Sequence, residues 1–404
     1  MTRFLKQAAA AFAGFLALAF ALNVWVDPYR IWNVRHGFSQ QAPRPRAVQQ
    51  LHLLKSRGLA RSRPVTVVLG NSRAEIGFDP RSRSWPLSLR PVYNASIPGT
   101  GIDTATSLLS DAVSAGRLRT AVIGLDFLDF LTDPENPTPP THPTAPAEQR
   151  SAMQRATEDV KIGLSLDTLI DSTLTLISAH DPYAPDVTAD GFNPLREYAL
   201  NARLDGYGSL FLQKDIANAR AYTKAPKGIF ARSATTSATW QELDQLLTSL
   251  HDHDIDVRFV IYPYHAHILE MFHRSGLFPA FESWKKHLAE VLVAWEGDGG
   301  ICRLWDFSGY NAYSTEFVPP PDDRKTVVRW YWESGHFKPE LGDRMLERMF
   351  GEGDAGFGTC LTERNIEAVN SRVREARTRY LRKTPEASAA IDALFRGVQR
   401  GTSP

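Results

Sequence analysis

Cysteine is scarce in this chain, since Cys302 and Cys360 are the only two among 404 residues. Two cysteines exclude a small disulfide-dense scaffold and a four-cysteine zinc site. They can still pair in an oxidising compartment if the fold brings their Cα atoms within about 7 Å. A surplus of charge is also missing, because 46 basic side chains face 45 acidic ones. Nucleic-acid-binding proteins usually carry a basic surplus, so nucleic acid is not an expected partner.

Long apolar runs are also scarce, and the one that could span a bilayer stands near the N-terminus. Residues 7–26, QAAAAFAGFLALAFALNVWV, contain no charge, and about 20 such residues cross a bilayer at about 1.5 Å per residue. Arg3 and Lys6 precede this run, and basic residues stay in the cytoplasm. Residues 1–27 are therefore predicted to form a single-pass signal-anchor in the inner (cytoplasmic) membrane, with the remaining chain facing the periplasm.

A cleaved signal peptide is the alternative interpretation of the same run. Ala19, Phe20 and Ala21 resemble the small-x-small site at which signal peptides are cut. The apolar run extends past this site through Trp25, which favours an anchor that remains uncleaved. Both interpretations export the rest of the chain, and the first also makes the membrane a partner through the N-terminal helix.

Short β-branched runs alternate with helical segments in the exported part. Strands are expected at 65–69, 92–95, 120–125, 257–262 and 301–307, and helices at 102–116, 239–251, 281–295 and 339–350. Such alternation is typical of an α/β fold with a doubly wound parallel sheet flanked by helices. The expected fold therefore has an N-terminal transmembrane helix followed by an α/β domain.

A change of composition after Phe130 indicates an insertion in this domain. DPENPTPPTHPTAPAEQ is rich in Pro and Thr and cannot form a regular helix, whereas 165–177 has helical character. We expect a helical and irregular insertion between two halves of the α/β domain. In chain order, the segments after the anchor are a juxtamembrane lead-in at 28–60, a first half at 61–130, the insertion at 131–235, a second half at 236–350 and a basic helical tail at 351–404.

Two short motifs carry chemical groups. Ser72 follows the first expected strand, and open α/β sheets bind ligands at the carboxyl ends of their strands. Residues 333–336, ESGH, precede the closing helix, and Glu333 can turn back to accept the Nδ1–H of His336. That bond fixes the tautomer and leaves Nε2 free to take a proton from a serine. The alternatives are a helix N-cap for Ser72 and a loop histidine beside a solvated glutamate.

Taken together, these motifs resemble the GDSL, or SGNH, hydrolase superfamily. Residues 93–100, YNASIPGT, also resemble that family's second block, whose glycine N–H faces the oxyanion. The resemblance implies an SGNH-like fold and a serine esterase or O-acyltransferase without a cofactor. It implies Ser72 as the nucleophile, His336 as the base and Glu333 as the orienting acid. The oxyanion donors would include the N–H groups of Ser72 and Gly99.

Two positions depart from the family pattern. The third block is usually Gly-x-Asn-Asp, but the third strand here ends at Asp126 without an asparagine. An ionised Asp126 would repel an oxyanion, so it is expected to bind backbone, a substrate hydroxyl or Arg73. Glu333 stands where the family usually has Asp. Both departures favour an alternative function, a non-catalytic SGNH-like envelope scaffold that binds glycan or a membrane partner.

Further candidates for substrate contact surround these motifs. His265 and His267 follow the strand at 257–262, and they join Asp126 and Arg73 as expected substrate-binding residues. No third ligand has a recognisable spacing, so no metal site is expected. In its organisation the chain is also similar to bacterial envelope proteins related to alginate O-acetylation and teichoic-acid D-alanylation. That similarity implies an envelope polysaccharide as substrate and a multi-span membrane acyltransferase as partner.

Overall fold

The computed structural model describes residues 2–34, 37–39, 41–135, 152–232, 237–296, 302–351 and 353–400. A six-stranded sheet with the order β2-β1-β3-β4-β5-β8 lies at its centre. The neighbouring pairs from β2 to β5 are parallel, and β8 is antiparallel to β5. The strands are β1 Thr66–Leu69, β2 Val92–Asn94, β3 Thr120–Leu125, β4 Asp256–Ile261, β5 Leu304–Asp306 and β8 Thr359–Cys360. The predicted α/β class with a mostly parallel sheet is thus confirmed.

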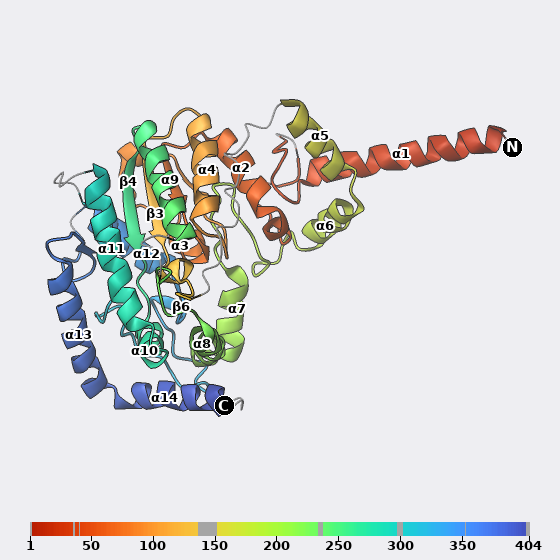
Figure 1. Ribbon diagram of the computed structural model, residues 1–404. Helices are drawn as coiled ribbons and strands as arrows, with labels where there is room; N and C mark the ends of the chain where they lie inside the picture. Colours follow the sequence, from red (N-terminus) through yellow and green to blue (C-terminus); the bar gives the residue numbers. More distant parts are fainter. Residues whose placement is uncertain are drawn as a thin grey trace.

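Helices cover both faces of this sheet (Figure 1). One layer consists of α2 Leu51–Ser62, α4 Ile102–Ser114, α9 Ala238–Asp252 and α11 Phe278–Glu296. The other face carries α3 Ser72–Gly77 and α12 Pro339–Phe350. All four residues of β1 are buried, as expected for a strand covered on both faces. Helix α4 buries Ile102, Ala105, Leu108, Leu109 and Ala112, a spacing that directs one helical face toward the core.

The N-terminal helix α1, Thr2–Val26, projects from the body of the molecule (Figure 1). It is long and apolar enough to cross a membrane. Most of its side chains are exposed, but Ala19, Asn23 and Val26 near its C-terminal end are buried. This end of α1 contacts α5 and α6 of the insertion, and the rest of the helix stands free of the described chain.

The insertion forms two helical pairs with different surroundings. Its helices are α5 Ala152–Gly163, α6 Leu166–Ile177, α7 Arg196–Asp205 and α8 Tyr207–Lys224. The pair α5 and α6 lies beside α1, whereas α8 contacts the short strand β6, Tyr331–Glu333. Helix α6 matches the helix predicted at 165–177. Most of the predicted Pro- and Thr-rich stretch, residues 136–151, lies outside the described residues.

A buried ion pair joins the lead-in and the insertion to the first helix of the sheet domain. Lys55 Nζ of α2 lies 3.4 Å from Glu75 Oε1 of α3, and both side chains are at most 1% exposed. Lys55 also donates to the carbonyl of Gly191, and Asn193 Nδ2 donates to Glu75 Oε2 at 3.3 Å. Gly191 and Asn193 belong to the insertion, so three segments distant in sequence meet at this pair.

The C-terminal part packs onto the same body. Its helices are α10 Ala266–Arg274, α13 Ile366–Lys383 and α14 Pro385–Arg400, and α14 contacts both α8 and α10. Arg377 of α13 makes two hydrogen bonds to the buried carboxylate of Glu270. Short 3-10 helices span Ala47–Gln50, Leu87–Leu89 and Phe127–Phe130.

A disulfide links Cys302 to Cys360, with a Cα–Cα distance of 5.6 Å. The bond joins the chain just before β5 to the edge strand β8. The two Cα atoms therefore lie within the distance of about 7 Å that a disulfide requires.

Candidate functional site

The site is centred on Ser72, which follows β1 as the first residue of α3. Ser72 Oγ lies 2.8 Å from His336 Nε2, although the two residues are 264 positions apart. Asn71 is the N-cap of α3, because its side chain accepts the Arg73 N–H at 3.0 Å. The capping role considered for Ser72 therefore belongs to Asn71, and the serine hydroxyl is available to the histidine. Ser72 is half-buried and the His336 side chain is 17% exposed, so both can be reached from solvent.

A tight hairpin positions the histidine and its carboxylate. Strand β6 ends at Glu333 and β7, His336–Phe337, begins three residues later. Glu333 Oε1 forms a hydrogen bond with His336 Nδ1, and the Gly335 N–H donates to Oε2 at 2.7 Å. Glu333 is 1% exposed, which excludes the solvated glutamate considered above. This β6–β7 hairpin was not predicted, because strands of two or three residues carry no readable periodicity.

The pKa of the Glu333 carboxyl is lowered despite its burial. Burial alone would raise this pKa, but His336, Lys214 and the Gly335 N–H favour the charged form and together lower it. The carboxylate is therefore ionised at neutral pH and can stabilise an imidazolium on His336. Lys214 comes from α8 of the insertion, and sequence reasoning missed it because no motif surrounds it.

A second buried pair lies beneath the site. Arg73 Nη1 pairs with Asp126 Oδ2, which also accepts from Asn71 Nδ2 at 2.8 Å. The Tyr264 hydroxyl donates to Asp126 Oδ1 at 2.9 Å. Arg73 Nε donates to the Gly335 carbonyl at 2.8 Å. Arg73 thus connects the turn that carries Ser72 to the turn that carries His336.

Arg73 and Asp126 were predicted to contact substrate. Both are buried, at 9% and 4% exposure, and their polar atoms bind one another and neighbouring protein groups. Burial alone would lower the pKa of Arg73, but the Asp126 carboxylate offsets this and raises it, so the guanidinium stays charged. Both residues therefore help to position the surrounding turns, and the substrate contact expected of them stays a prediction. Of the three partners considered for Asp126, the structure shows Arg73 and backbone, the latter through the Leu128 N–H at 3.3 Å.

His265 and His267, the other residues expected to touch substrate, are also engaged within the protein. His265 is 1% exposed; its Nδ1 caps α10 by accepting the His267 N–H, and its Nε2 donates to the Glu316 carbonyl at 3.1 Å. Burial and the neighbouring His267 hold the pKa of His265 well below its usual value, so this ring is neutral. His267 Nδ1 lies 2.7 Å from Asp215 Oδ2, with 13% of the side chain exposed. These contacts give both histidines partners within the protein, and the substrate contact expected of them stays a prediction.

Tyr262 and Tyr264 contribute to the site but were missed at the sequence level. The Arg73 guanidinium lies 5.8 Å from the Tyr262 ring centre and 5.2 Å from that of Tyr264. Both tyrosines stand in YPYHAH, directly after β4 and in the same short segment as the two histidines. Two aromatic rings at the end of a parallel strand were an available signal for a buried cation.

The backbone near Ser72 supplies two candidate hydrogen-bond donors. Among the described residues, neither the Ser72 N–H nor the Gly99 N–H has a hydrogen-bond partner. Gly99 has a φ of 71°, and a Cβ built there would meet no atom within 4 Å. The Ile97 N–H donates to the Gly70 carbonyl at 3.0 Å, which holds the loop of Gly99 beside the Ser72 turn. Unpartnered N–H groups at a nucleophile are the donors that an oxyanion requires.

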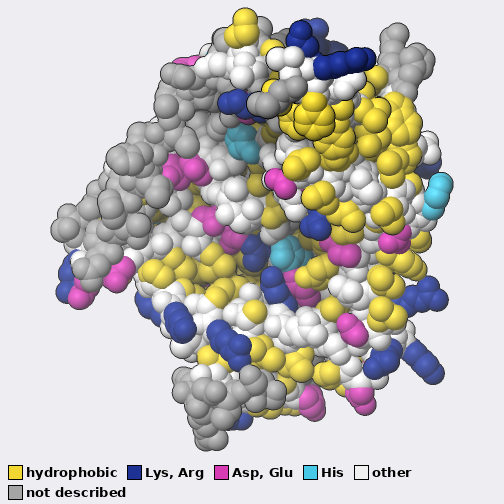
Figure 2. All heavy atoms as spheres, turned by 90° about the vertical axis from the view of Figure 1, so that its right-hand side faces the viewer, with side chains coloured by type: hydrophobic (Ala, Val, Ile, Leu, Met, Phe, Trp, Pro, Cys, Tyr) yellow, Lys and Arg dark blue, Asp and Glu magenta, His cyan; other side chains and the backbone are white. Residues whose placement is uncertain are grey.

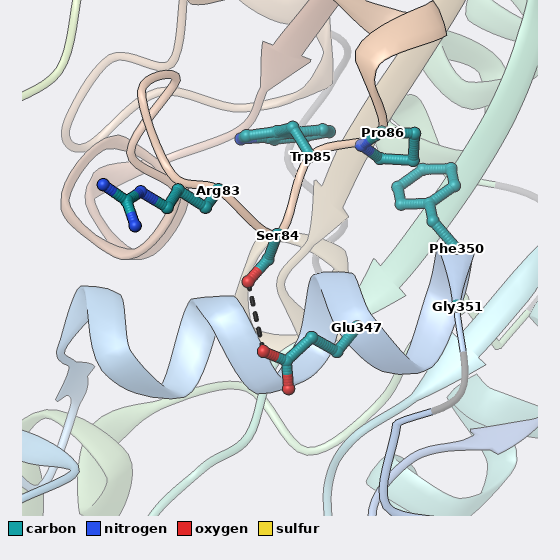
Figure 3. A pocket seen from close by; sticks show the side chains of 7 residues that line it. All are labelled: Arg83, Ser84, Trp85, Pro86, Glu347, Phe350 and Gly351. Atoms are coloured by element: carbon teal, nitrogen blue, oxygen red, sulfur yellow. Dashed lines mark hydrogen bonds between the residues drawn. The ribbon is translucent and has the colours of Figure 1, made fainter.

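Two surface cavities lie elsewhere on the molecule. One of about 240 Å³ is lined by Arg83, Ser84, Trp85, Pro86, Glu347, Phe350 and Gly351, and within it Ser84 Oγ donates to Glu347 Oε1 at 3.2 Å (Figure 3). The other, of about 600 Å³, is lined by Ser62, Pro80, Arg81, Arg90, Pro91, Val92, Ala189 and Asp190. Neither includes a residue of the Ser72 site. The described part of the chain contains no group of three or more His, Cys, Asp or Glu that could hold a metal ion.

A scan against protein-family models finds no match to this chain, and a search of the curated proteins finds none. The function is therefore inferred from the site.

Proposed function

We propose that this chain is an SGNH-like serine acyl-ester hydrolase or O-acyltransferase. The observation that carries the proposal is the series of contacts from Ser72 Oγ to His336 Nε2 and from His336 Nδ1 to Glu333. A serine, a histidine and a buried ionised carboxylate in this order form the arrangement that activates a serine hydroxyl. Its place at the carboxyl ends of parallel strands, and the free N–H groups of Ser72 and Gly99, support the same function.

The chemistry follows from these groups. His336 Nε2 takes the Ser72 proton as Oγ attacks the acyl carbonyl, and the Ser72 and Gly99 N–H groups stabilise the resulting oxyanion. The tetrahedral intermediate collapses, the leaving alkoxide takes the proton from His336, and the acyl group remains on Ser72. Water or a sugar hydroxyl then gives its proton to His336 and attacks the acyl-enzyme. As this second tetrahedral intermediate collapses, the bond between Ser72 Oγ and the acyl carbon breaks and His336 returns the proton to Ser72 Oγ. No cofactor enters these steps.

The proposed substrate is an acylated glycan of the cell envelope, encountered on the periplasmic side of the inner membrane. Helix α1 is long and apolar enough for an anchor, and Arg3 and Lys6 precede its apolar core. The Cys302–Cys360 disulfide supports an oxidising compartment. A multi-span membrane acyltransferase that supplies acyl groups is the proposed partner for the transfer reaction.

Labelling with a fluorophosphonate tests this function against its rival. The full-length protein in detergent micelles is expected to react, and peptide mass spectrometry should place the adduct on Ser72. The rival is a non-catalytic scaffold, which the missing third-block asparagine favours. If folded protein resists the probe at every concentration that labels a standard serine esterase, the scaffold function replaces the enzymatic one.

Glu333 provides a graded test of the mechanism. Glu333→Gln is expected to lower kcat/KM for a simple acyl ester by about 10²- to 10⁴-fold, because the His336 tautomer and the imidazolium lose their partner. Glu333→Asp, which keeps the charge, should remain within about tenfold of the parent protein. Steady-state kinetics measured on both variants test whether the negative charge at position 333 supports turnover. Undiminished activity in Glu333→Gln would remove this carboxylate from the mechanism.

The orientation of the chain has a simple measurement of its own. Alkaline phosphatase fused after Pro404 is expected to be active, and green fluorescent protein fused at the same place should be dark after export through the general secretory route. Both reporters respond to the compartment that the C-terminus reaches. The reverse pattern would place Ser72 in the cytoplasm and end the proposal of an envelope substrate.

A further inference from the structure

Helix α6 buries polar side chains and exposes aliphatic ones, although Asp167 and Thr173 are exposed as well. The inward face consists of buried polar side chains: Thr168, Asp171, Ser172 and Thr175. The outward face carries Leu166, Ile170 and Ile177, which are 63%, 58% and 75% exposed. Surface helices of water-soluble domains show the opposite pattern, since burial of their apolar stripe is what stabilises them. An exposed aliphatic stripe of this length therefore indicates an apolar environment outside the protein.

Helix α5 continues this surface. Met153 and Val160 are 75% and 48% exposed, and Leu164, in the turn between the two helices, is 41% exposed. Positions 153 and 160 share one face of α5, because seven residues make about two helical turns. With α6 they form what we call the aliphatic surface, defined as Met153, Val160, Leu164, Leu166, Ile170 and Ile177.

The polar face of α6 is attached to the C-terminal end of α1. Ser172 Oγ donates to Asn23 Oδ1 at 2.8 Å, and Asn23 Nδ2 donates to the Gly163 carbonyl at 3.0 Å. The Tyr29 hydroxyl donates to Asp171 Oδ2 at 2.6 Å. Asn23 is fully buried in these contacts. The position of α6 relative to the anchor is therefore fixed by specific hydrogen bonds.

The position of a membrane around α1 follows from its length. The 25 residues of α1 span about 37 Å at about 1.5 Å per residue, and a hydrocarbon core is about 30 Å thick. If the core begins just after Lys6, its outer boundary lies close to Val26. Asn23, and with it α6, then lies at the boundary between acyl chains and headgroups. Figure 2, which views the molecule from the side on which α1 projects, shows hydrophobic side chains gathered in the upper part of this face.

We propose that the aliphatic surface is a second membrane contact, which inserts into the outer leaflet beside α1. Amphipathic helices of monotopic proteins bury their apolar faces about 5–10 Å into this boundary. A lipid surface is favoured over a second copy of the chain because the surface adjoins the anchor that brings it to the bilayer. The proposal rests on the proposed membrane anchoring by α1 and is independent of the catalytic activity.

Lipid contact can be measured at single positions. Full-length Ile170→Cys is labelled with an environment-sensitive nitrobenzoxadiazole dye and reconstituted at low protein density in vesicles of phosphatidylethanolamine and phosphatidylglycerol. The native cysteines are bonded to each other and do not compete for the dye. Emission is expected to shift to the blue, and lipids that carry a nitroxide near the headgroup should quench it at least about twofold. The matched control is Leu87→Cys, which is 86% exposed in a 3-10 helix and should be unaffected by these lipids.

A third position separates failure of this proposal from failure of the anchor. Leu18→Cys lies on α1, with 71% of Leu18 exposed, and should be quenched by nitroxides deep in the acyl region. Quenching at residue 18 without quenching at 170 would overturn the aliphatic surface as a lipid contact and leave the anchor intact. Protection at 170 that appears only at high protein density, without lipid quenching, would assign the surface to a second copy. Loss of quenching at both positions would reject the anchor itself.

Discussion

Replacing Ser72 with alanine is expected to lower kcat for an acyl ester by about 10⁵-fold or more while the protein stays folded. The loss is large because the serine hydroxyl forms the covalent intermediate, and His336 and Glu333 have no other nucleophile to activate. Stability should change little, because the substitution removes one half-buried hydroxyl and its bond to His336. The measurement is ester turnover by full-length protein, with the free energy of unfolding determined on the same sample.

Ser88→Ala is the matched control for this substitution. Ser88 is exposed in the 3-10 helix at Leu87–Leu89, and its loss should leave turnover unchanged. Comparable turnover in Ser72→Ala and in the parent protein would show that any ester cleavage comes from another group or a contaminant. The hydrolase function would then be abandoned.

Replacing Asp126 with alanine is expected to lower the free energy of unfolding by about 3–5 kcal/mol. The substitution leaves the Arg73 guanidinium buried without its counter-charge and removes the acceptor of Asn71 Nδ2 and of the Tyr264 hydroxyl. A buried charge without a partner is among the most destabilising changes that a single substitution can cause. Chemical denaturation of the full-length protein in detergent, followed by tryptophan fluorescence, measures the effect.

A double variant tests whether the expected loss of stability comes from the unpaired charge of Arg73 or from the loss of side-chain packing. Arg73→Leu combined with Asp126→Leu removes both charges and should recover stability to within about 2 kcal/mol of the parent protein. Its turnover should remain low, because the Gly335 carbonyl loses the Arg73 N–H that holds the histidine turn. If Asp126→Ala is as stable as the parent protein, Arg73 and Asp126 do not form the buried ion pair that their contacts indicate.

The sheet and the contact of Ser72, His336 and Glu333 could be predicted from the sequence because each has a local signature. β1, β3 and β4 are runs of β-branched residues, and Ser72, Glu333 and His336 stand in short motifs at the ends of elements. The surroundings of the site could not be predicted, because burial and partner choice depend on contacts between distant segments. Arg73 and Asp126 are polar residues at a strand end, and no local pattern tells whether such residues face substrate or each other.

The difference between local patterns and long-range contacts also explains why the surroundings of His265, His267 and Lys214 were not predicted. His265 and His267 stand where a ligand-binding residue would stand, and only the folded structure shows that the Glu316 carbonyl and Asp215 contact them. Lys214 reaches the site from α8 of the insertion. The contact of α8 with β6 is long-range, so no local sequence pattern predicts it. The sequence predicted a helix at 165–177, but which of its faces is buried depends on contacts such as that with Asn23 of α1.

The Lys55–Glu75 pair limits how this protein can be shortened for study in solution. Glu75 belongs to the short helix that begins with Ser72, Lys55 precedes the first strand, and Asn193 lies within the insertion. A fragment that starts at residue 64 would leave Glu75 without its cation, and removal of the insertion would take away the groups that close over it. A soluble version without α1 should therefore keep residues 41–62 and the whole insertion. The turn that carries Ser72 therefore depends on segments that a comparison of motifs alone would discard.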